Sequence, residues 1–440
     1  MKIFLFAAAF VFSSLILLSC KKDNPVPPEQ QPQVNLTLED VSCTEAWIKL
    51  STSNISLPAD VELQKDGSFY RTINLIVPDT ALYIDSLLPN KTYNFKSIIQ
   101  SSNQSITSAT LPVTTMDTTS HNFTWQTWTF GGQAGSCTLN DVAVIDENNI
   151  WAVGEIYLLD TLGQPDPILY NLVVWNGIDW SIKRIPYYYE GQPFYHPILS
   201  IFAFGPNDIW FCSNGVIRWD GNQYNPISIP TNIWGPYQMN KIWGTSDNDI
   251  YVVGNNGNIA HYQNGLWSRM VSGTNLNIND IWGYNSEQTQ EKNIIAVGGN
   301  ILEGLENIII QITNGNSVVQ LNNEGANYPL SSVWFQNQMN LYAAGSGLYT
   351  MNIADTNWKQ IPLPNYFIYS IRANDLNDII VCGGAGYIGH YNGVSWVNYL
   401  ENGLPQILGN YYSCAIKGNI VCAVAATIDQ KAIAVIGTRN

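Results

Sequence analysis

Histidines, which most often serve in acid–base catalysis and metal binding, are few in this 440-residue chain and are scattered along it. Of the four, His261 and His390 each precede a tyrosine at the same place in two segments of similar sequence. His121 lies in a predicted linker, and His196 lies in a predicted loop. The repetition indicates a structural role for His261 and His390, and the four residues form no recognisable catalytic group.

Acidic residues offer two further kinds of chemistry. Asp247-Asn248-Asp249 looks like the D-x-D motif of metal-dependent glycosyltransferases, but here it falls on a turn that recurs along the chain, and no nucleotide-binding α/β pattern accompanies it. A carboxylate pair for glycoside hydrolysis stays open, although no spacing singles out a pair. The arginines that a sialidase-like site would need are scattered. Val297-Gly298-Gly299-Asn300 ends a strand with no helix after it, unlike a phosphate-binding loop. We therefore predict no catalytic residue, no metal site and no cofactor, and we favour a protein that is not an enzyme.

The charge balance limits the partners. The chain has 34 acidic and 19 basic residues, which gives a formal net charge of -15. Binding to phosphate backbones needs a basic patch, so nucleic acid is excluded as the expected partner. Charged residues make up only 12% of the chain and aromatic residues another 12%. This composition indicates folded domains rather than disorder.

The N-terminus has the features of an export signal. Lys2 precedes an apolar run that extends from Ile3 to Leu18 and is shorter than the roughly 20 residues that span a membrane. Leu17-Leu18-Ser19-Cys20 resembles the lipobox of bacterial lipoproteins. The resemblance implies a signal peptide over residues 1–19, a lipid anchor on Cys20 and, with Lys21 next, the outer membrane, facing the periplasm or the cell exterior. The Pro-rich residues 20–34 are a predicted tether.

Six further cysteines follow, and their spacing matches no metal-binding pattern. Cys212 and Cys382 fall at equivalent places in two repeats and are predicted core thiols. Cys414 and Cys422 flank a tight turn, so a disulfide between them stays open.

Residues 35–116 predict a small β-sandwich, because short apolar runs alternate with turn residues. Leu87-Leu88-Pro89-Asn90-Lys91-Thr92-Tyr93 resembles the L-x-P-G-T-x-Y signature of fibronectin type III domains, with Asn90 and Lys91 as departures. The resemblance implies that Tyr93 is the corner tyrosine and that Trp47 is the core tryptophan of an early strand. A spacer is the expected role of such a domain.

Residues 122–440 contain a repeat in which an apolar strand, a short Asn/Asp turn and a second apolar strand recur. The aliphatic positions of the second strand are Ile150, Ile209, Ile250, Ile294, Leu341, Ile379 and Ile420. A period of about 40–45 residues with strands throughout is typical of four-stranded propeller blades. The sequence therefore predicts an all-β fold in which the sandwich is followed by a seven-bladed β-propeller.

A second unit completes each predicted blade. Trp175-Asn176-Gly177-Ile178-Asp179-Trp180 has counterparts that begin at Trp219, Tyr262 and Tyr391, each with an aromatic residue five positions on. This turn resembles that of Asp-box (BNR) propellers, although the Asp two residues before Gly is mostly replaced. The region is also similar to bacterial surface lipoproteins that pair a fibronectin-like module with a propeller. The last repeat lacks a fourth strand, so residues 123–130 are predicted to supply it and to close the ring.

The loops that connect successive blades are rich in aromatic residues and open on one face of a propeller. Loops of this kind on a rigid scaffold are where binding usually occurs. The predicted ligand-binding residues are Tyr187, Tyr188, Tyr189, Phe194, Tyr195, Trp234, Tyr237, Tyr366 and Phe367. The alternative is that these rings pack between neighbouring blades.

The sequence leaves two functions open. The first is a membrane-anchored extracytoplasmic lipoprotein, expected to be a monomer, that binds a glycan or a protein without transforming it. The second is a carbohydrate-active enzyme that uses the same propeller face.

Overall fold

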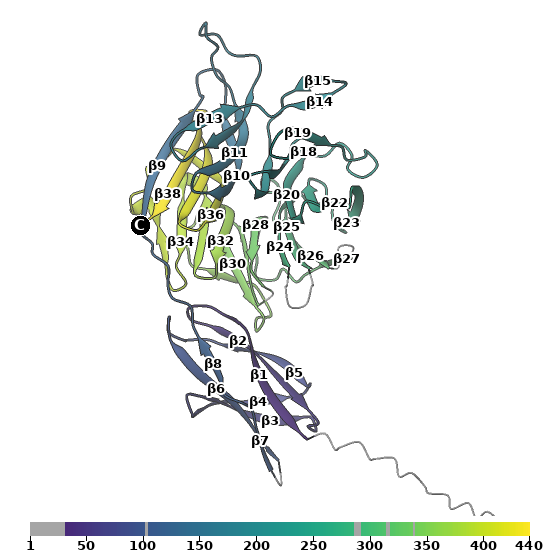
Figure 1. Cartoon of the computed structure of the whole chain (residues 1–440), viewed down its shortest axis with the longest axis vertical. Coiled ribbons are helices and arrows are strands. Elements are labelled where there is room, and N and C mark those ends of the chain that lie inside the picture. The colour runs from purple at the N-terminus through teal and green to yellow at the C-terminus, as the bar shows by residue number, and fades with distance from the viewer. Residues whose placement is uncertain (1–30, 102–103, 286–291, 314–316, 338) are drawn as a thin grey trace, which may run out of the picture.

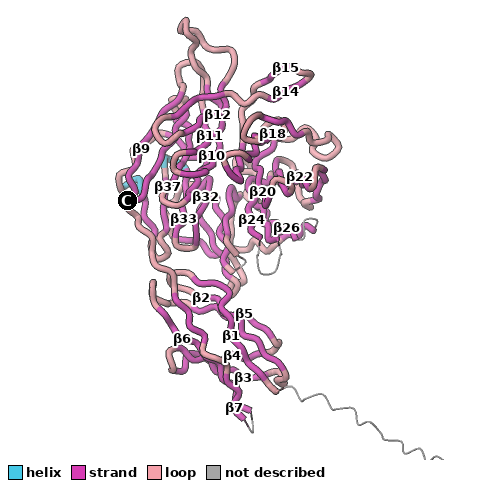
Figure 2. The backbone as a smooth tube through the Cα atoms, in the orientation of Figure 1, coloured by secondary structure: helices cyan, strands magenta, loops and turns pink. Residues whose placement is uncertain are grey.

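The computed structural model describes residues 31–101, 104–285, 292–313, 317–337 and 339–440. The predicted signal peptide, Cys20 and most of the predicted tether lie outside these residues. Strands are almost the only regular secondary structure of the described chain, apart from two short 3-10 turns at Gly384–Gly386 and Tyr399–Glu401 (Figure 2). Over the same residues, none of the helices has the length and apolarity needed to cross a membrane.

The N-terminal unit consists of two facing sheets. Its strands are β1 (Gln33–Val41), β2 (Ala46–Ser53), β3 (Ala59–Lys65), β4 (Ser68–Leu75), β5 (Asp79–Ile84), β6 (Thr92–Ser101), β7 (Gln104–Thr107) and β8 (Leu111–Thr114). One sheet has the order β1-β2-β5, and the other has the order β4-β3-β6-β7 with β8 paired to β6. Alternate residues such as Ile48, Leu63 and Phe95 are buried between the sheets, as the period of two along a strand requires. The hydroxyl of Tyr93 accepts a hydrogen bond from Leu88 N at 2.9 Å and so fixes the bend before β6.

Trp47 does not occupy the place that the sequence predicts. It is fully buried, but it packs with Trp334 and Tyr342 of the C-terminal unit rather than between the two sheets of the sandwich. Ala46 and Ile48, its neighbours on β2, face the sandwich core. Because side chains alternate across a strand, Trp47 points out of the sandwich and into the contact between the two units.

The C-terminal unit contains seven four-stranded antiparallel sheets. The first comprises β10 (Thr138–Asp146), β11 (Asn149–Ile156), β12 (Tyr170–Trp175) and β13 (Trp180–Lys183), and the second comprises β16 (Ser200–Gly205), β17 (Asp208–Cys212), β18 (Val216–Trp219) and β19 (Tyr224–Ile227). The third comprises β20 (Met239–Ser246), β21 (Asp249–Gly254), β22 (Asn258–Gln263) and β23 (Leu266–Val271), and the fourth comprises β24 (Ile278–Asn285), β25 (Lys292–Gly298), β26 (Ile308–Thr313) and β27 (Ser317–Gln320). The fifth comprises β28 (Leu330–Phe335), β29 (Asn340–Gly345), β30 (Gly347–Asn352) and β31 (Lys359–Ile361), and the sixth comprises β32 (Ile368–Asp375), β33 (Asp378–Gly383), β34 (Ile388–Tyr391) and β35 (Trp396–Asn398). The seventh comprises β36 (Gly409–Lys417), β37 (Ile420–Thr427), β38 (Ala432–Arg439) and β9 (Phe123–Phe130), and a separate hairpin is formed by β14 (Tyr187–Tyr189) and β15 (Gln192–Phe194).

The repeated sequence units explain the repeated sheets. The aliphatic positions from Ile150 to Ile420 lie on the second strand of each sheet, and none of them is more than 7% exposed. The aromatic pair of the second unit closes the turn between the third and fourth strands, because Trp175 lies opposite Trp180 and Trp219 lies opposite Tyr224. Local sequence therefore specifies both the buried strand and the tight turn that follows it.

The fourth strand of the last sheet comes from the opposite end of the unit. Residues 123–130 form β9, which runs antiparallel to β38 with Phe123 opposite Arg439 and Phe130 opposite Ala432. Strand β36 of this sheet contacts β10 of the first sheet, and the first strands of successive sheets also contact one another. The termini of the seven-sheet unit are thus joined in one sheet (Figure 1).

The described cysteines are all free and buried. Cys212 and Cys382 are core thiols, as predicted. The disulfide between Cys414 and Cys422 does not form, because Cys414 lies opposite Ala423 and Cys422 lies opposite Ala415 on adjacent strands. The two thiols point to opposite faces of the sheet and belong to different core clusters.

Candidate binding face and central channel

The connections between strands define two faces of the seven-sheet unit. The turns between first and second strands and between third and fourth strands lie on one side, which we call the proximal face because the sandwich docks there. The Asn337 amide bonds to Asp40, and Asn377 Nδ2 donates to Asp117 O at 2.7 Å. The opposite side, the distal face, carries the remaining connections. They are 131–137, 157–169, 184–199, 213–215, 228–238, 255–257, 272–277, 299–307, 321–329, Ser346, 362–367, 384–387, 399–408 and 428–431. Figure 1 shows the sandwich at one end of the molecule and hairpin β14–β15 at the other.

Hairpin β14–β15 carries four of the predicted ligand-binding residues, and a fifth, Tyr195, follows it directly. Tyr188 and Phe194 have 48% and 46% of their surface exposed. Tyr187 is half-buried and packs against the core cluster between the first two sheets, and the half-buried Tyr195 has Arg184 over its ring at 6.0 Å. The backbone of Tyr189 lies in β14, and its side chain is outside the described part. The rings of Tyr188 and Phe194 are thus exposed to solvent, whereas Tyr187 packs against the core and anchors the hairpin.

Trp234 corrects one prediction, because this ring is not exposed. It is 4% exposed, packs with Trp210 and Met239, and donates from Nε1 to Tyr237 O at 2.7 Å. Tyr237 is 43% exposed. Both line a pocket of about 560 Å³ on the distal face, where Trp234 forms part of the floor and Tyr237 part of the rim.

Tyr366 and Phe367 are half-buried. Tyr366 stacks on Tyr387 with a centroid distance of 5.2 Å. Phe367 contacts Tyr369 at 4.7 Å, and Tyr369 meets Tyr412 edge-to-face at 5.2 Å. Tyr369 and Tyr412 also line a polar pocket that opens between the first strands of the sheets, and we call this space the central channel. The aromatic series therefore continues from the rim toward the centre. The nine predicted residues therefore share one face but do not form a single cluster.

Aliphatic residues of the distal loops are exposed as well, and no sequence motif points to them. They are Leu159, Leu162, Ile168, Leu302, Leu305, Leu408 and Ile428, with exposed fractions between 39% and 96%. A lone Leu or Ile in a polar loop gives no signal by itself, because its exposure depends on where the loop folds. Long loop length was the available signal.

A β-bulge recurs at one level of the channel wall. The register shifts between Leu139 and Asp141 in β10, and equivalent shifts occur in β20, β24, β28, β32 and β36. Several bulge residues bond to the backbone of the following sheet: Asn140 Nδ2 donates to Ile198 O at 2.9 Å, and Asn279 Nδ2 donates to Leu330 O at 2.7 Å. The bulges thus aim side chains between neighbouring first strands, which is a common use of a bulge.

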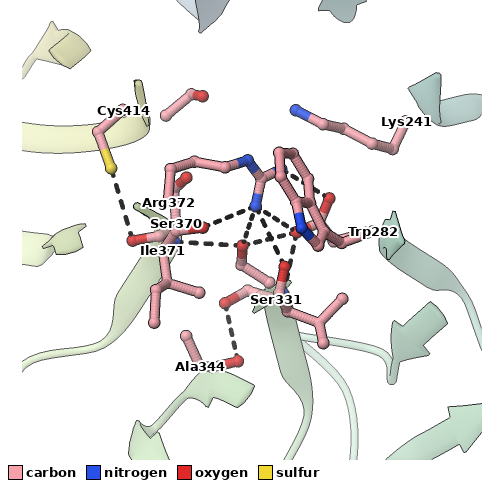
Figure 3. A network of polar contacts seen from close by, with 12 residues as sticks. Lys241, Trp282, Ser331, Ala344, Ser370, Ile371, Arg372 and Cys414 are labelled. Carbon is pink, nitrogen blue, oxygen red and sulfur yellow. Dashed lines mark hydrogen bonds and ion pairs between the residues drawn. The ribbon is translucent and has the colours of Figure 1, made fainter. Parts of the chain in front are cut away.

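Two buried ion pairs cross the channel at the level of the bulges. Lys241 Nζ lies 2.7 Å from Asp141 Oδ2, and both nitrogens of the Arg372 fork lie 2.9 Å from the Asp280 carboxylate. Figure 3 shows Arg372 at the centre of its network, beside the ring of Trp282, whose centroid is 4.9 Å away. Every one of these charges has an opposite partner, so the layer serves first as structure.

Hydrogen bonds hold the Asp141 carboxylate in its charged form. Burial acts to raise its pKa, but Lys241 and the hydroxyls of Ser200 and Ser413, each 2.7 Å away, together lower the pKa below its usual range. Asp141 therefore joins the first sheet to the second, third and seventh sheets. The ion-pair layer separates a polar pocket of about 100 Å³ at the distal mouth from a more apolar cavity of about 150 Å³ below it.

The two histidines of the repeat make buried hydrogen bonds to aspartates. His261 Nε2 lies 2.7 Å from Asp249 Oδ1, and His390 Nε2 lies 2.8 Å from Asp378 Oδ1, with both rings buried. Asp249, which ends the D-x-D sequence, also pairs with Lys292 at 2.9 Å. Among the residues that the structure describes, no group of three or more His, Cys, Asp or Glu side chains is placed to hold a metal ion.

Comparisons with known proteins give the fold class. No family model matches the sequence, and no curated protein matches it. A solved structure of YCF48 bound to D1 peptide superposes with a TM-score of 0.53 at 15% identity, covering 73% of this chain and 99% of the other. YCF48 from Cyanidioschyzon merolae gives 0.50 at 14% identity, covering 72% and 98%. With these neighbours and its four-stranded sheets, the chain contains a β-propeller.

Proposed function

We propose that this chain is a lipid-anchored extracytoplasmic protein whose propeller binds a glycan or a protein on its distal face without transforming it. The observation that carries the proposal is the concentration of exposed aromatic and aliphatic side chains on that face, with Tyr188, Phe194 and Tyr237 among them. Exposed apolar groups on one side of a folded protein mark interaction sites. The charges in the channel are paired, which favours binding over catalysis.

The finer architecture belongs to the same proposal. We take the seven sheets as the blades of one closed ring, supported by the pairing of β9 with β38 and the contact of β36 with β10. We take the sandwich as fibronectin type III-like, supported by its two-sheet strand order and by the Tyr93 hydroxyl bond to Leu88 N. Such a tyrosine corner is characteristic of immunoglobulin-like sandwiches.

The placement of the sandwich fits an anchor at the N-terminus. Strand β1 runs toward the propeller, because Asp40 near its end contacts Asn337. Gln33, at the start of the same strand, lies about 23 Å farther away at 3.3 Å per residue. A membrane anchor that precedes Gln33 would hold the proximal side toward the membrane and present the distal face to ligands. YCF48 bound to D1 peptide is a precedent for peptide binding by this fold.

The test uses protein that lacks residues 1–20 on a glycan array and on an array of extracytoplasmic peptides, with a parallel assay for sugar hydrolysis and transfer. Tyr188→Ala with Phe194→Ala removes two exposed rings at about 1 kcal/mol each. Binding should weaken roughly tenfold or more. The matched control, Ile178→Ala with Leu266→Ala, removes two residues that are 77% and 76% exposed at proximal turns and should leave binding unchanged. Equal loss in both variants, or sugar turnover, would reject the proposal.

A further inference from the structure

A pocket of about 630 Å³ lies on the distal face between the fourth and fifth sheets. Its walls come from the connections 299–307 and 321–329, and Leu276 contributes from the preceding connection. The pocket combines apolar and acidic side chains. Leu305 is 71% exposed and Tyr328 is 47% exposed, while Glu306 and Glu324 are exposed as well.

Hydrogen bonds from two of its neutral amides, Asn307 and Asn323, fix the walls of this pocket. Asn307 Nδ2 donates to Ala326 O at 2.6 Å and to Tyr328 O at 2.9 Å. Asn323 Nδ2 donates to Asn307 Oδ1 at 2.8 Å, and Trp358 N donates to Glu324 O at 2.8 Å. Both loops are therefore held in place before a ligand arrives, which reduces the entropy lost on binding.

The two carboxylates are left for a ligand. Among the ion pairs of the described residues, none involves Glu306 or Glu324. Two basic side chains of the distal connections already have acidic partners of their own. Arg184 pairs with Asp166, and Lys431 pairs with Asp429. The pocket thus offers negative charge next to apolar surface, and the chain carries a net charge of -15. A ligand that complements this pocket carries a positively charged group next to an apolar group.

We propose that this pocket binds a lysine or arginine side chain of a polypeptide partner, with an adjacent apolar side chain of that partner against Leu305 and Tyr328. This inference rests on the proposed function and narrows its ligand to a basic, partly apolar polypeptide. A neutral glycan offers no cation to Glu306 and Glu324. The ring of Tyr328 can add a cation–π contact to the same positive group.

The test measures fluorescence anisotropy of a fluorescein-labelled peptide, Gly-Ser-Leu-Arg-Leu-Ser-Gly, with the chain lacking residues 1–20. A matched peptide carries Gln in place of Arg. We expect the Arg peptide to bind at least tenfold more tightly than the Gln peptide. Glu306→Gln with Glu324→Gln should remove this preference and leave the weak binding of the Gln peptide unchanged.

The control variant is Glu39→Gln with Glu147→Gln, which removes two exposed carboxylates from the sandwich and the proximal face. It lowers the net negative charge equally and should keep the Arg preference. An equal loss in the control would show a general charge effect and overturn the inference, as would equal binding of the two peptides or no binding of the Arg peptide. The proposed function would survive such a result if another ligand still responded to Tyr188→Ala with Phe194→Ala.

Discussion

His121 Nδ1 lies 2.7 Å from His390 Nδ1, so the segment that joins the sandwich to β9 is fastened to the sixth sheet. The other nitrogen of His390 bonds to Asp378, which also pairs with Arg439. His121 Nε2 lies 3.2 Å from Ser395 Oγ. Two imidazole nitrogens at this distance must share one proton, with one ring donating and the other accepting. The contact therefore requires that at least one of the two rings stay neutral.

This contact predicts a loss of stability in mild acid. Burial, His390 and Arg439 lower the pKa of His121 to about 4, with Asp378 opposing them. The unfolded chain takes up the proton near pH 6.5 and the folded chain does not, so the stabilisation is complete above pH 6.5 and declines as the pH falls toward 4. We expect urea unfolding to show a smaller free energy at pH 5 than at pH 7.

The control for this prediction is His121→Asn, which removes the titrating ring. Asp40, whose pKa is raised to about 6 by burial, contributes a slope of opposite sign, so the quantity to compare is the difference between the two proteins at each pH. That difference should shrink between pH 6.5 and 4. A difference that stays constant with pH would show that His121 does not titrate in this range.

Features encoded by neighbouring residues could be predicted from the sequence, and features that join distant residues could not. The alternation around Ile150 and the aromatic turn from Trp175 to Trp180 are local, and both became strands and turns as predicted. The apolar pattern around Trp47 correctly predicts a strand. Nothing near Trp47 in the sequence shows that Trp334 covers the face of this strand that points away from the sandwich core. Likewise, whether a loop aromatic is exposed depends on what packs above it.

The interface tryptophan gives a prediction of its own. Trp47 is fully buried between the sandwich and the fifth and sixth sheets, so Trp47→Ala leaves a cavity there. We expect it to lower the free energy of unfolding by about 3–5 kcal/mol and to speed proteolysis within residues 115–122. Trp47→Phe is the matched control and should cost less, because Nε1 has no hydrogen-bond partner to lose. A cost below about 1 kcal/mol for Trp47→Ala would contradict the shared core.

A further prediction concerns Asp141, which joins several sheets around the channel. Asp141→Asn removes the charge that balances Lys241 and weakens the bonds to Ser200 and Ser413. Breaking a buried pair costs about 3–5 kcal/mol, to be measured by urea unfolding. Adding Lys241→Met removes the unbalanced charge and should restore part of the stability. No recovery in the double variant would show that the hydroxyl bonds, rather than the ion pair, hold the layer.

The anchor prediction concerns Cys20, which precedes the described residues. If Leu17-Leu18-Ser19-Cys20 is a lipobox, Cys20→Ser leaves no thiol to acylate. Metabolic labelling with an alkyne fatty acid should mark the wild-type protein and not the variant, and the variant should leave the membrane fraction. Buried Cys43→Ser serves as the control and should keep its label. Equal labelling of Cys20→Ser would rule out this anchor.

Trp234 and Tyr188 were predicted from the same sequence signal, and the structure gives them different roles. Trp234 is 4% exposed and bonds to Tyr237 O, whereas Tyr188 is 48% exposed on its hairpin. Trp234→Ala should therefore lower the free energy of unfolding by about 3–5 kcal/mol. Tyr188→Ala should change it by no more than about 0.5 kcal/mol while weakening ligand binding. Thermal unfolding beside binding measurements separates the two effects: a large stability loss for Tyr188→Ala would make its ring part of the core, and the distal face would then lose one of the exposed rings on which the proposed function rests.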